Sequence, residues 1–241
     1  MTGHVALDED FHVHSTFSDG ASTLAENVQA ARERGLRTLC LVDHVRRDTA
    51  WLPDFVAAVS RYRGQSGMRG QSGMRVLVGV EAKILDGSGT LDVPPGLDGI
   101  DLVLIADHRF PAEHGPVHPA EVRAAIQNGA MSPAAAIEQL CEATARALEA
   151  TDRRPLIAHL FSVLPKIGLD EAMVPEPLLA HLAKRIADTA AMAEVNEKWS
   201  CPSARAVTAL ARAGVPLVAG SDSHHCRDVG VYRSVRLTVG T

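Results

Sequence analysis

The sequence of 241 residues is poor in cysteine, in aromatic residues and in positive charge. Its cysteines are far apart and form no CxxC pair, which argues against a disulfide framework or zinc knuckle: Cys40, Cys141, Cys201 and Cys226. A formal charge of −5 argues against a surface for long nucleic acid. No apolar run approaches the ~18 residues that span a bilayer, and residues 1–10 lack the apolar stretch of a signal peptide. We therefore expect a cytoplasmic protein whose partners include neither a membrane nor long nucleic acid.

Histidine is the exception to this scarcity. The chain has 11 histidines against two tyrosines, two tryptophans and five phenylalanines. Since histidine is the commonest metal ligand and a frequent acid or base, this surplus suggests a chemical site. The length and the 46% apolar content predict a single domain over residues 1–241, and they carry no sign of the oligomeric state.

Short β-rich runs alternate with helical patterns along the chain. We predict seven strands, near residues 9–14, 37–43, 75–81, 101–106, 155–159, 192–196 and 215–221. Several are almost entirely apolar, as expected for parallel strands covered by helices on one side and a packed core on the other. The alternation predicts an α/β fold with a parallel sheet, either open or closed into a barrel.

Local signals mark the helix ends. Thr23 and Glu26 match a capping box, and Gly35 suits the position just after the same helix. Ser132 predicts the start of a long helix, and Gly214 the end of the last one.

Two segments break the alternation. Residues 64–75 repeat the hexapeptide GQSGMR and predict a flexible surface loop. Residues 107–131 contain several prolines and predict a long loop or short-helix excursion that partly covers a pocket.

The stretch DFHVHSTFSDG, residues 10–20, places His12 and His14 on either side of one valine. On a strand, alternate side chains share a face, so both imidazoles would project together while Phe11 and Val13 point the other way. Two adjacent imidazoles would supply half of a metal site.

Further metal-ligating side chains stand at or just after the ends of the other predicted strands. They are His44, Glu81, His108, His159, Asp222 and His224. In a parallel barrel all carboxyl ends of strands open on one face, which carries the catalytic groups. A single histidine after a strand is more often a hydrogen-bonded loop or core residue. The recurrence of one strand-end position instead favours a joint site of imidazoles and carboxylates, which would accept zinc, iron or manganese.

The motif order HxH, SDG, DH, GxE, H, H and SDSH, from His12 to His224, resembles the PHP (polymerase and histidinol phosphatase) family. The resemblance implies a distorted (β/α)7 TIM-like barrel, which agrees with the seven predicted strands. It also implies a centre of two or three divalent metal ions, typically zinc, iron or manganese, that hydrolyses the phosphoester of a small phosphorylated substrate.

The resemblance also implies which residues bind each metal, because the family's ligand positions match motif positions in this sequence. The first would be bound by His12, His14, Glu81 and Asp222. The second would share Glu81 and add His108 and His159. The third would be bound by Asp19, His44 and His224. Asp19 departs from histidinol-phosphatase-like relatives, which often have a histidine near this position, and the departure bears on the subfamily.

Such a centre would clamp a phosphate and share a bridging hydroxide, because metal binding lowers the pKa of water to about 7. The hydroxide would attack phosphorus in line while the cations neutralise the remaining oxygens. We expect Glu81, Asp222 and His224 to be catalytic, since they would bring neighbouring metals together. His225 and Asp19 are both open as the general acid.

Cationic side chains beside these positions are candidates for phosphate binding, because the arginine fork suits bidentate contact. Arg109 is the first choice, since it adjoins His108 in the long loop. The others are Arg46, Arg47, Lys83 and Arg227. A solvated loop charge is the alternative for each. Asn196, at the end of the sixth strand, would either orient a ligand or satisfy backbone groups.

Asp43 and Asp107 each precede a candidate ligand, and two roles are open for them. A carboxylate behind a metal-bound imidazole orients it. Strand alternation would instead point both away from the site, toward a cap or a helix. The histidines without a motif position are expected at the surface: His4, His114, His118 and His181.

The ligand set favours a metal-dependent phosphoesterase that acts on a small phosphomonoester. Hydrolysis of a phosphodiester or small nucleotide is an alternative, because the charge disfavours only long nucleic acid. A non-catalytic, metal-stabilised module is a third reading, although such a module would be expected to have lost ligand residues.

Overall fold

The structure is a computed structural model that describes residues 4–63, 73–151 and 153–240. Seven parallel strands form one sheet in the order β1-β2-β3-β4-β7-β8-β9. Their bounds are Glu9–Val13, Thr38–His44, Arg75–Lys83, Leu102–Ala106, Pro155–Ile157, Met192–Asn196 and Leu217–Gly220. The seven predicted strands are therefore confirmed.

The two edge strands approach each other and nearly close the sheet into a barrel. Val13, at the end of β1, forms a parallel bridge with Ser223, just after β9. The buried carboxylate of Asp10 reinforces this closure, because it accepts hydrogen bonds from the backbone amides of Ser221 at 2.9 Å and Gly230 at 2.8 Å. The fold is the distorted (β/α)7 TIM-like barrel that the family resemblance implies.

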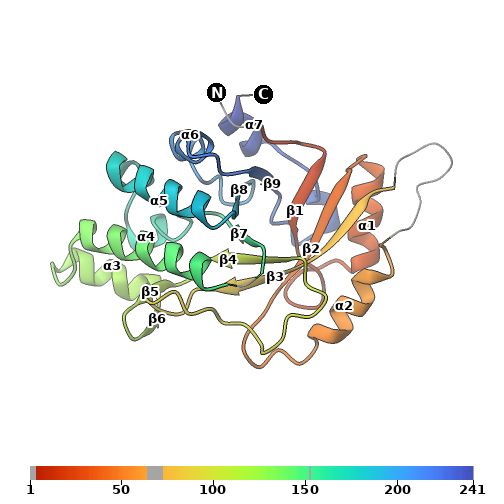
Figure 1. Ribbon diagram of the computed structural model, residues 1–241, viewed down its shortest axis with the longest axis horizontal. Coiled ribbons are helices and arrows are strands. Elements are labelled where there is room, and N and C mark those ends of the chain that lie inside the picture. Colours follow the sequence, from red (N-terminus) through yellow and green to blue (C-terminus); the bar gives the residue numbers. More distant parts are fainter. Residues whose placement is uncertain (1–3, 64–72, 152, 241) are drawn as a thin grey trace.

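Helices surround the barrel (Figure 1). They are α1 (Leu24–Glu33), α2 (Leu52–Ser60), α3 (Pro119–Gln127), α4 (Pro133–Ala150), α5 (Glu176–Asp188), α6 (Ala204–Arg212) and α7 (Ser234–Val239). The predicted capping box of Thr23 and Glu26 is present at α1, and Ser132 caps α4. Gly35 follows α1 with a φ of 70°, a conformation that glycine adopts readily. These helix signals are confirmed. Gly214 follows α6 with a φ of 86°, as predicted, but α6 is not the last helix, because α7 comes after it.

The segment 107–131 contains a short helix, α3, as one of the two predicted alternatives had it, and also a hairpin that was not predicted. Its strands β5 (Phe110–Ala112) and β6 (Gly115–Val117) form an antiparallel hairpin, which is followed by α3. Phe110 is completely buried and anchors the hairpin to the core. This tertiary contact overrides the loop signal of the prolines.

Three short 3-10 turns complete the described structure: η1 (Pro165–Ile167), η2 (Glu171–Met173) and η3 (Cys226–Asp228). Most of the predicted loop over residues 64–75 lies outside the described residues. Among the helices in the described part of the chain, none combines the length and apolar character needed to cross a membrane.

Candidate metal centre

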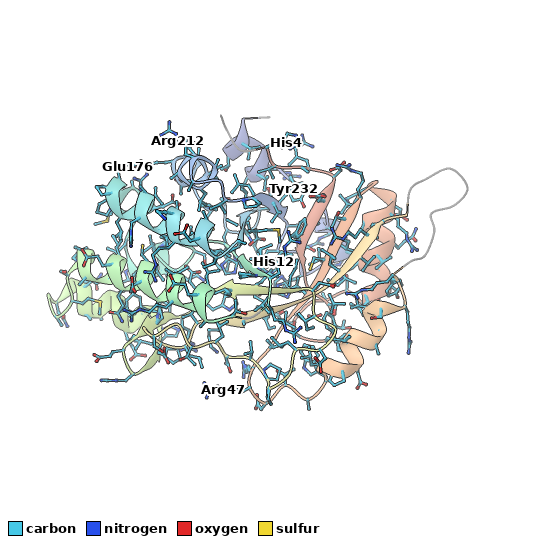
Figure 2. The ribbon with its side chains drawn as sticks, in the orientation of Figure 1. His4, His12, Arg47, Glu176, Arg212 and Tyr232 are labelled. Atoms are coloured by element: carbon cyan, nitrogen blue, oxygen red, sulfur yellow. The ribbon has the colours of Figure 1, made fainter. Side chains whose placement is uncertain are left out.

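All nine predicted ligands lie in one connected cluster at the carboxyl ends of the strands. They are His12, His14, Asp19, His44, Glu81, His108, His159, Asp222 and His224. The parallel register of β2 and β3 sets His44 beside Glu81. His12 lies in the interior of the molecule, whereas His4 lies at its periphery (Figure 2). The sheet thus brings together residues that are far apart in the sequence.

The buried carboxylate of Glu81 is the centre of the cluster. Its Oε1 lies 2.9 Å from Nε2 of both His108 and His159. Its Oε2 lies within 3.4 Å of ring nitrogens of His12, His14 and His44. One carboxylate therefore contacts five imidazoles, which is the arrangement expected of a group shared between ions.

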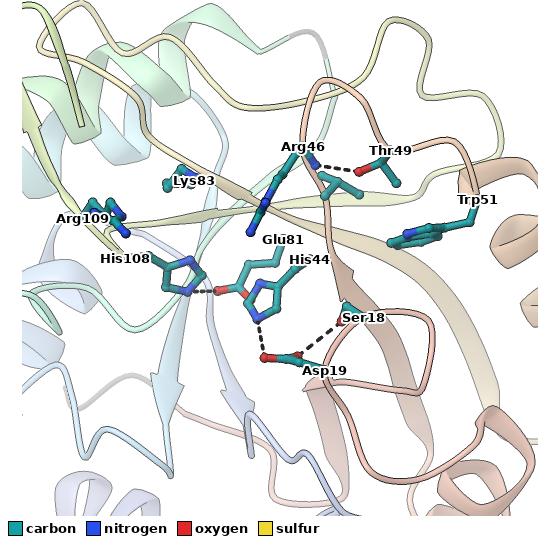
Figure 3. A pocket seen from close by; sticks show the side chains of 11 residues that line it. Ser18, Asp19, His44, Arg46, Thr49, Trp51, Glu81, Lys83, His108 and Arg109 are labelled. Carbon is teal, nitrogen blue, oxygen red and sulfur yellow. Dashed lines mark hydrogen bonds and ion pairs between the residues drawn. The ribbon is translucent and has the colours of Figure 1, made fainter. Parts of the chain in front are cut away.

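Two further carboxylates extend the cluster toward the surface. Oδ1 of buried Asp222 lies 3.5 Å from Nε2 of His14 and 3.5 Å from Nδ1 of His224. Asp19, which is exposed, lies 3.5 Å from His44 and 3.4 Å from His224 through its two oxygens. Figure 3 shows Asp19 facing His44 across the mouth of the cluster.

The donor set fits divalent metal ions. Three groups have their ligand atoms close enough to hold an ion: His14 with Asp19, His44 and His224; His12 with His14 and Glu81; and His44 with Glu81 and His108. Among the described residues, the buried atoms His14 Nδ1 and Glu81 Oε2 have no hydrogen-bond partner. Nε2 of His12 and Nε2 of His14 face each other at 3.0 Å. Imidazole nitrogens with carboxylate oxygens are typical ligands of zinc, iron and manganese.

Electrostatics keep the central carboxylate ionised. Burial opposes charge on Glu81, but the nearby His108 and His12 outweigh it and hold the pKa of Glu81 well below its usual range. Burial also opposes charge on His159, but contacts with Asp107 and Glu81 raise the pKa of His159 to about 10. Burial lowers the pKa of His14 to about 4. A cation entering this cluster would therefore meet an ionised central carboxylate and displace protons from imidazoles.

Two of the candidate ligands have an unfavourable backbone conformation. His159 has a φ of 32° and Asp222 a φ of 51°, both in the left-handed region that favours glycine. Such residues cost of order 1–3 kcal/mol each and concentrate at functional sites.

Glu194 on β8 supports the cluster, and the sequence analysis did not identify it. It is completely buried, and His12 Nδ1 lies 3.0 Å from its Oε1. Its Oε2 accepts a hydrogen bond from the backbone amide of His159 at 2.8 Å. A Cβ at Gly220 on the neighbouring strand would lie 1.8 Å from Glu194 Oε1, so only glycine fits there. The sequence feature that could have identified Glu194 is that it is the only charged residue in the otherwise apolar start of the strand MAEVN.

Asp107 and Asp43 take different roles. Oδ1 of Asp107 lies 3.3 Å from Nδ1 of His159, so it orients that histidine rather than the adjacent His108. Asp43 accepts hydrogen bonds from the backbone amides of Ser15 at 3.1 Å and Ser18 at 3.2 Å. It therefore fixes the loop that carries Asp19.

A cavity of about 550 Å³ opens beside the cluster (Figure 3). Arg46, Lys83 and Arg109 line it together with Trp51. Lys83 also pairs with Asp92 at 3.2 Å. The cavity floor includes four candidate ligands: Asp19, His44, Glu81 and His108. The cluster is thus accessible from a cationic pocket.

Arg227 and His225 lie away from this cavity and from a smaller cavity beside Asp222. The Arg227 side chain is 74% exposed and lies 3.6 Å from Asp228. His225 Nδ1 accepts a hydrogen bond from the Arg227 amide and so caps η3. Arg47 is exposed, and its amide donates to Asp92. Neither Arg227 nor His225 is among the residues that line those cavities.

A smaller cavity of about 220 Å³ adjoins Asp222 and is lined by Lys198 and Trp199, which the sequence analysis did not identify. Nζ of Lys198 lies 3.2 Å from Asp222 Oδ1, and Trp199 Nε1 donates to Asp222 Oδ2 at 2.9 Å. Asn196 is buried beside them. Its side-chain Nδ2 donates a hydrogen bond to Asp222 Oδ2 at 3.5 Å, and its Oδ1 accepts one from the backbone amide of Trp199 at 2.8 Å. Lys198 and Trp199 both follow the end of β8. A search for functional side chains just after every predicted strand would therefore have found them.

Comparison with known proteins agrees with this geometry. The model of the PHP domain family matches residues 10–196. A probable phosphatase of Vibrio parahaemolyticus is 25% identical over 92% of this chain and 79% of its own length. One from Aliivibrio fischeri is 33% identical over 49% of this chain and 46% of its own length. Among solved structures, a histidinol phosphate phosphatase of Lactococcus lactis, complexed with zinc, L-histidinol and phosphate, is similar with a TM-score of 0.64. It is 16% identical, and the match covers 96% of this chain and 92% of that one.

Proposed function

The chain belongs to the PHP domain family, and from this premise we propose that it is a metal-dependent phosphatase of a small phosphomonoester. Family membership and relatives named as phosphatases identify it as a hydrolase of phosphoesters. The observation that carries the proposal is the contact of the buried Glu81 carboxylate with five imidazoles, which lie on or just after four different strands.

We assign the ligands in three sets, of which the first two share Glu81. The first is His12, His14, Glu81 and Asp222, supported by the contacts at Glu81 Oε2 and Asp222 Oδ1. The second is Glu81, His108 and His159, supported by the contacts at Glu81 Oε1. The third is Asp19, His44 and His224. His44 also lies near Glu81, which favours closely spaced ions.

When bound, two or three such ions, whether zinc, iron or manganese, would lower the pKa of water and neutralise charge on the phosphoryl oxygens. The chain's own residues would do the rest. Arg46 and Arg109 would bind the phosphate from the cavity wall, and the arginine fork suits two of its oxygens. Glu194 and Asp107 would hold the imidazoles of His12 and His159 in orientation.

Neither earlier candidate suits the role of general acid. Burial opposes charge on Asp19, but His44 and His224 outweigh it and lower the pKa of Asp19, as suits a metal ligand. His225 caps η3 and lines neither cavity. The cavity of about 550 Å³ suits a small metabolite, as in the Lactococcus protein with its L-histidinol and phosphate. The four cysteines are free, which supports a reducing, cytoplasmic location.

The test is release of inorganic phosphate from phenyl phosphate by protein that has been stripped of metal and then reloaded with zinc, iron or manganese. His14→Ala and Asp222→Ala should each lower kcat/KM by more than about a hundredfold, because each removes a ligand. His114→Ala is the matched control, since His114 is 91% exposed and outside the cluster. Full turnover in either ligand variant would refute the proposal.

A further inference from the structure

A third cavity, of about 350 Å³, opens on the α3 side of the cluster. Its lining includes Arg109, His118 and Lys166. His108 and Arg109 line both this cavity and the larger one, so the two adjoin across the edge of the candidate metal centre. We call it the α3 cavity.

The α3 cavity is lined by cations that form no direct ion pair with any described residue, although the carboxylates of Asp107 and Asp222 act on Lys166 from a greater distance. No aspartate or glutamate is among its lining residues. Within the described parts of the chain, neither Arg109 nor Lys166 forms an ion pair with a carboxylate, although Lys83 nearby is neutralised by Asp92. In a protein whose net charge is −5, unpaired cations at one cavity favour an anionic ligand.

Lys166 is held in place from the side of the candidate metal centre. Its Nζ lies 3.8 Å from the centroid of the Trp199 ring, a cation–π contact. Trp199 in turn donates its indole hydrogen bond to Asp222 at 2.9 Å. The position of the ammonium group is therefore coupled to a candidate metal ligand. The first turn of α3 borders the same cavity, where His118 Nδ1 accepts a hydrogen bond from the Ala120 amide at 3.2 Å.

We propose that the α3 cavity is a second anion subsite, and that the substrate carries a second phosphate or carboxylate in addition to the phosphate that is cleaved. The inference rests on the proposed phosphatase function and deepens it. The cleaved phosphate lies at the candidate metal centre, and the second anionic group reaches past His108 to Lys166. Arg109, which lines both cavities, lies between the two anions and contacts both. Phosphate esters whose other end carries an ammonium group are disfavoured, because that charge would meet the two cations.

The experiment compares substrates that differ only at the far end. Four alkyl phosphates carry a hydroxyl, a carboxylate, a second phosphate or an amine there, and each is made with a propyl and a hexyl spacer. The readout is kcat and KM for phosphate release by the metal-loaded full chain. The carboxylate or bisphosphate member should have a KM about tenfold or more below that of the hydroxyl member, as expected for one charge-assisted contact. The better of the two identifies the second group.

Variants assign the preference to the cavity. Lys166→Gln should raise KM for the preferred dianionic substrate about tenfold more than for the hydroxyl member, and Lys166→Arg should retain the preference. Lys184→Gln is the matched control, because Lys184 is 71% exposed on α5 and pairs with Asp188. It should change neither KM.

Two failures are distinguishable. Equal KM values across the series, or an amine member preferred over the anionic ones, would overturn the second subsite while leaving the phosphatase intact. Absence of phosphate release from every compound by metal-loaded wild type would overturn the proposed function, and the subsite with it.

Discussion

At the scale of single residues, Glu194 shows how the barrel orients ligands from behind. Its two oxygens contact His12 on β1 and the backbone of His159, which follows β7. We predict that Glu194→Gln lowers metal affinity roughly 10- to 100-fold, because an amide cannot accept both hydrogen bonds. Competition with a fluorescent chelator measures this affinity.

The matched control for that substitution is Glu176→Gln. Glu176 is on the surface of α5, where it pairs with Arg205 at 3.1 Å, and its loss should leave metal affinity unchanged. Equal affinity of the Glu194 variant and wild type would show that His12 and His159 hold their positions without this carboxylate.

Asp10 gives a prediction about pH at the same scale. Burial raises the pKa of its carboxyl from 3.8 to about 6 in the folded chain. Between about pH 4 and about pH 6 the folded chain thus holds a proton that the unfolded chain has lost, and the contribution of Asp10 to the free energy of unfolding falls as the pH rises. Asp10→Asn lacks this contribution.

The stability of metal-free wild type relative to Asp10→Asn should therefore decline across that window, by at most about 1.4 kcal/mol per pH unit. Urea unfolding at several pH values measures the difference. A difference that stays constant, or that moves in favour of wild type as the pH rises, would contradict the assignment.

The candidate ligands could be predicted from sequence, but the residues behind them could not. His44, Glu81 and Asp222 each stand at a strand end, a position that local patterns reveal. Glu194 acts on His12 across the barrel, and that partnership depends on how β8 faces β1 once the sheet curls. Side-chain alternation along the strand would have pointed Asp107 away from the site. Its carboxylate instead contacts the ring of His159, and not that of its neighbour His108.

At the scale of elements, the loop between β1 and α1 positions Asp19 through a close backbone approach. A Cβ at Gly20 would lie 2.7 Å from the amide nitrogen of Ser15 and 2.8 Å from the carbonyl carbon of His14. The end of β1 is fixed by its bridge to Ser223, so an added methyl group would move the loop instead.

We therefore predict that Gly20→Ala displaces Asp19 and weakens only the outer ion, so that metal content falls by about one ion per chain. Elemental analysis of protein dialysed against excess metal measures this. Gly87→Ala is the control, because the nearest atoms to its Cβ lie 3.9 Å away. Unchanged metal content in the Gly20 variant would show that the loop tolerates the methyl group or that Asp19 binds no metal.

The elements themselves followed well from sequence where the signals were local. The capping box at Thr23 and the serine cap at Ser132 fixed two helix starts. The hairpin of β5 and β6 was missed because its stability comes from the burial of Phe110, a long-range contact. Prolines in a sequence indicate only how the local backbone is restricted. They do not indicate whether a side chain such as Phe110 packs into the core.

At the scale of the whole molecule, the barrel brings together residues that are far apart in the sequence. Strand β1 near the start of the chain and β9 near its end meet through Val13 and Ser223, and this closure brings Asp222 to His14 at 3.5 Å. Ions bound to both would tie the two edges of the sheet together, so metal binding and barrel closure should support each other.

The measurement that tests this account most directly is a metal titration of the metal-free chain, in which bound ions per chain and phosphatase activity are followed together. Activity should be absent without metal, rise with occupancy and saturate at two or three ions per chain. Phosphate release that is independent of added metal, or saturation of binding below one ion per chain, would contradict the account.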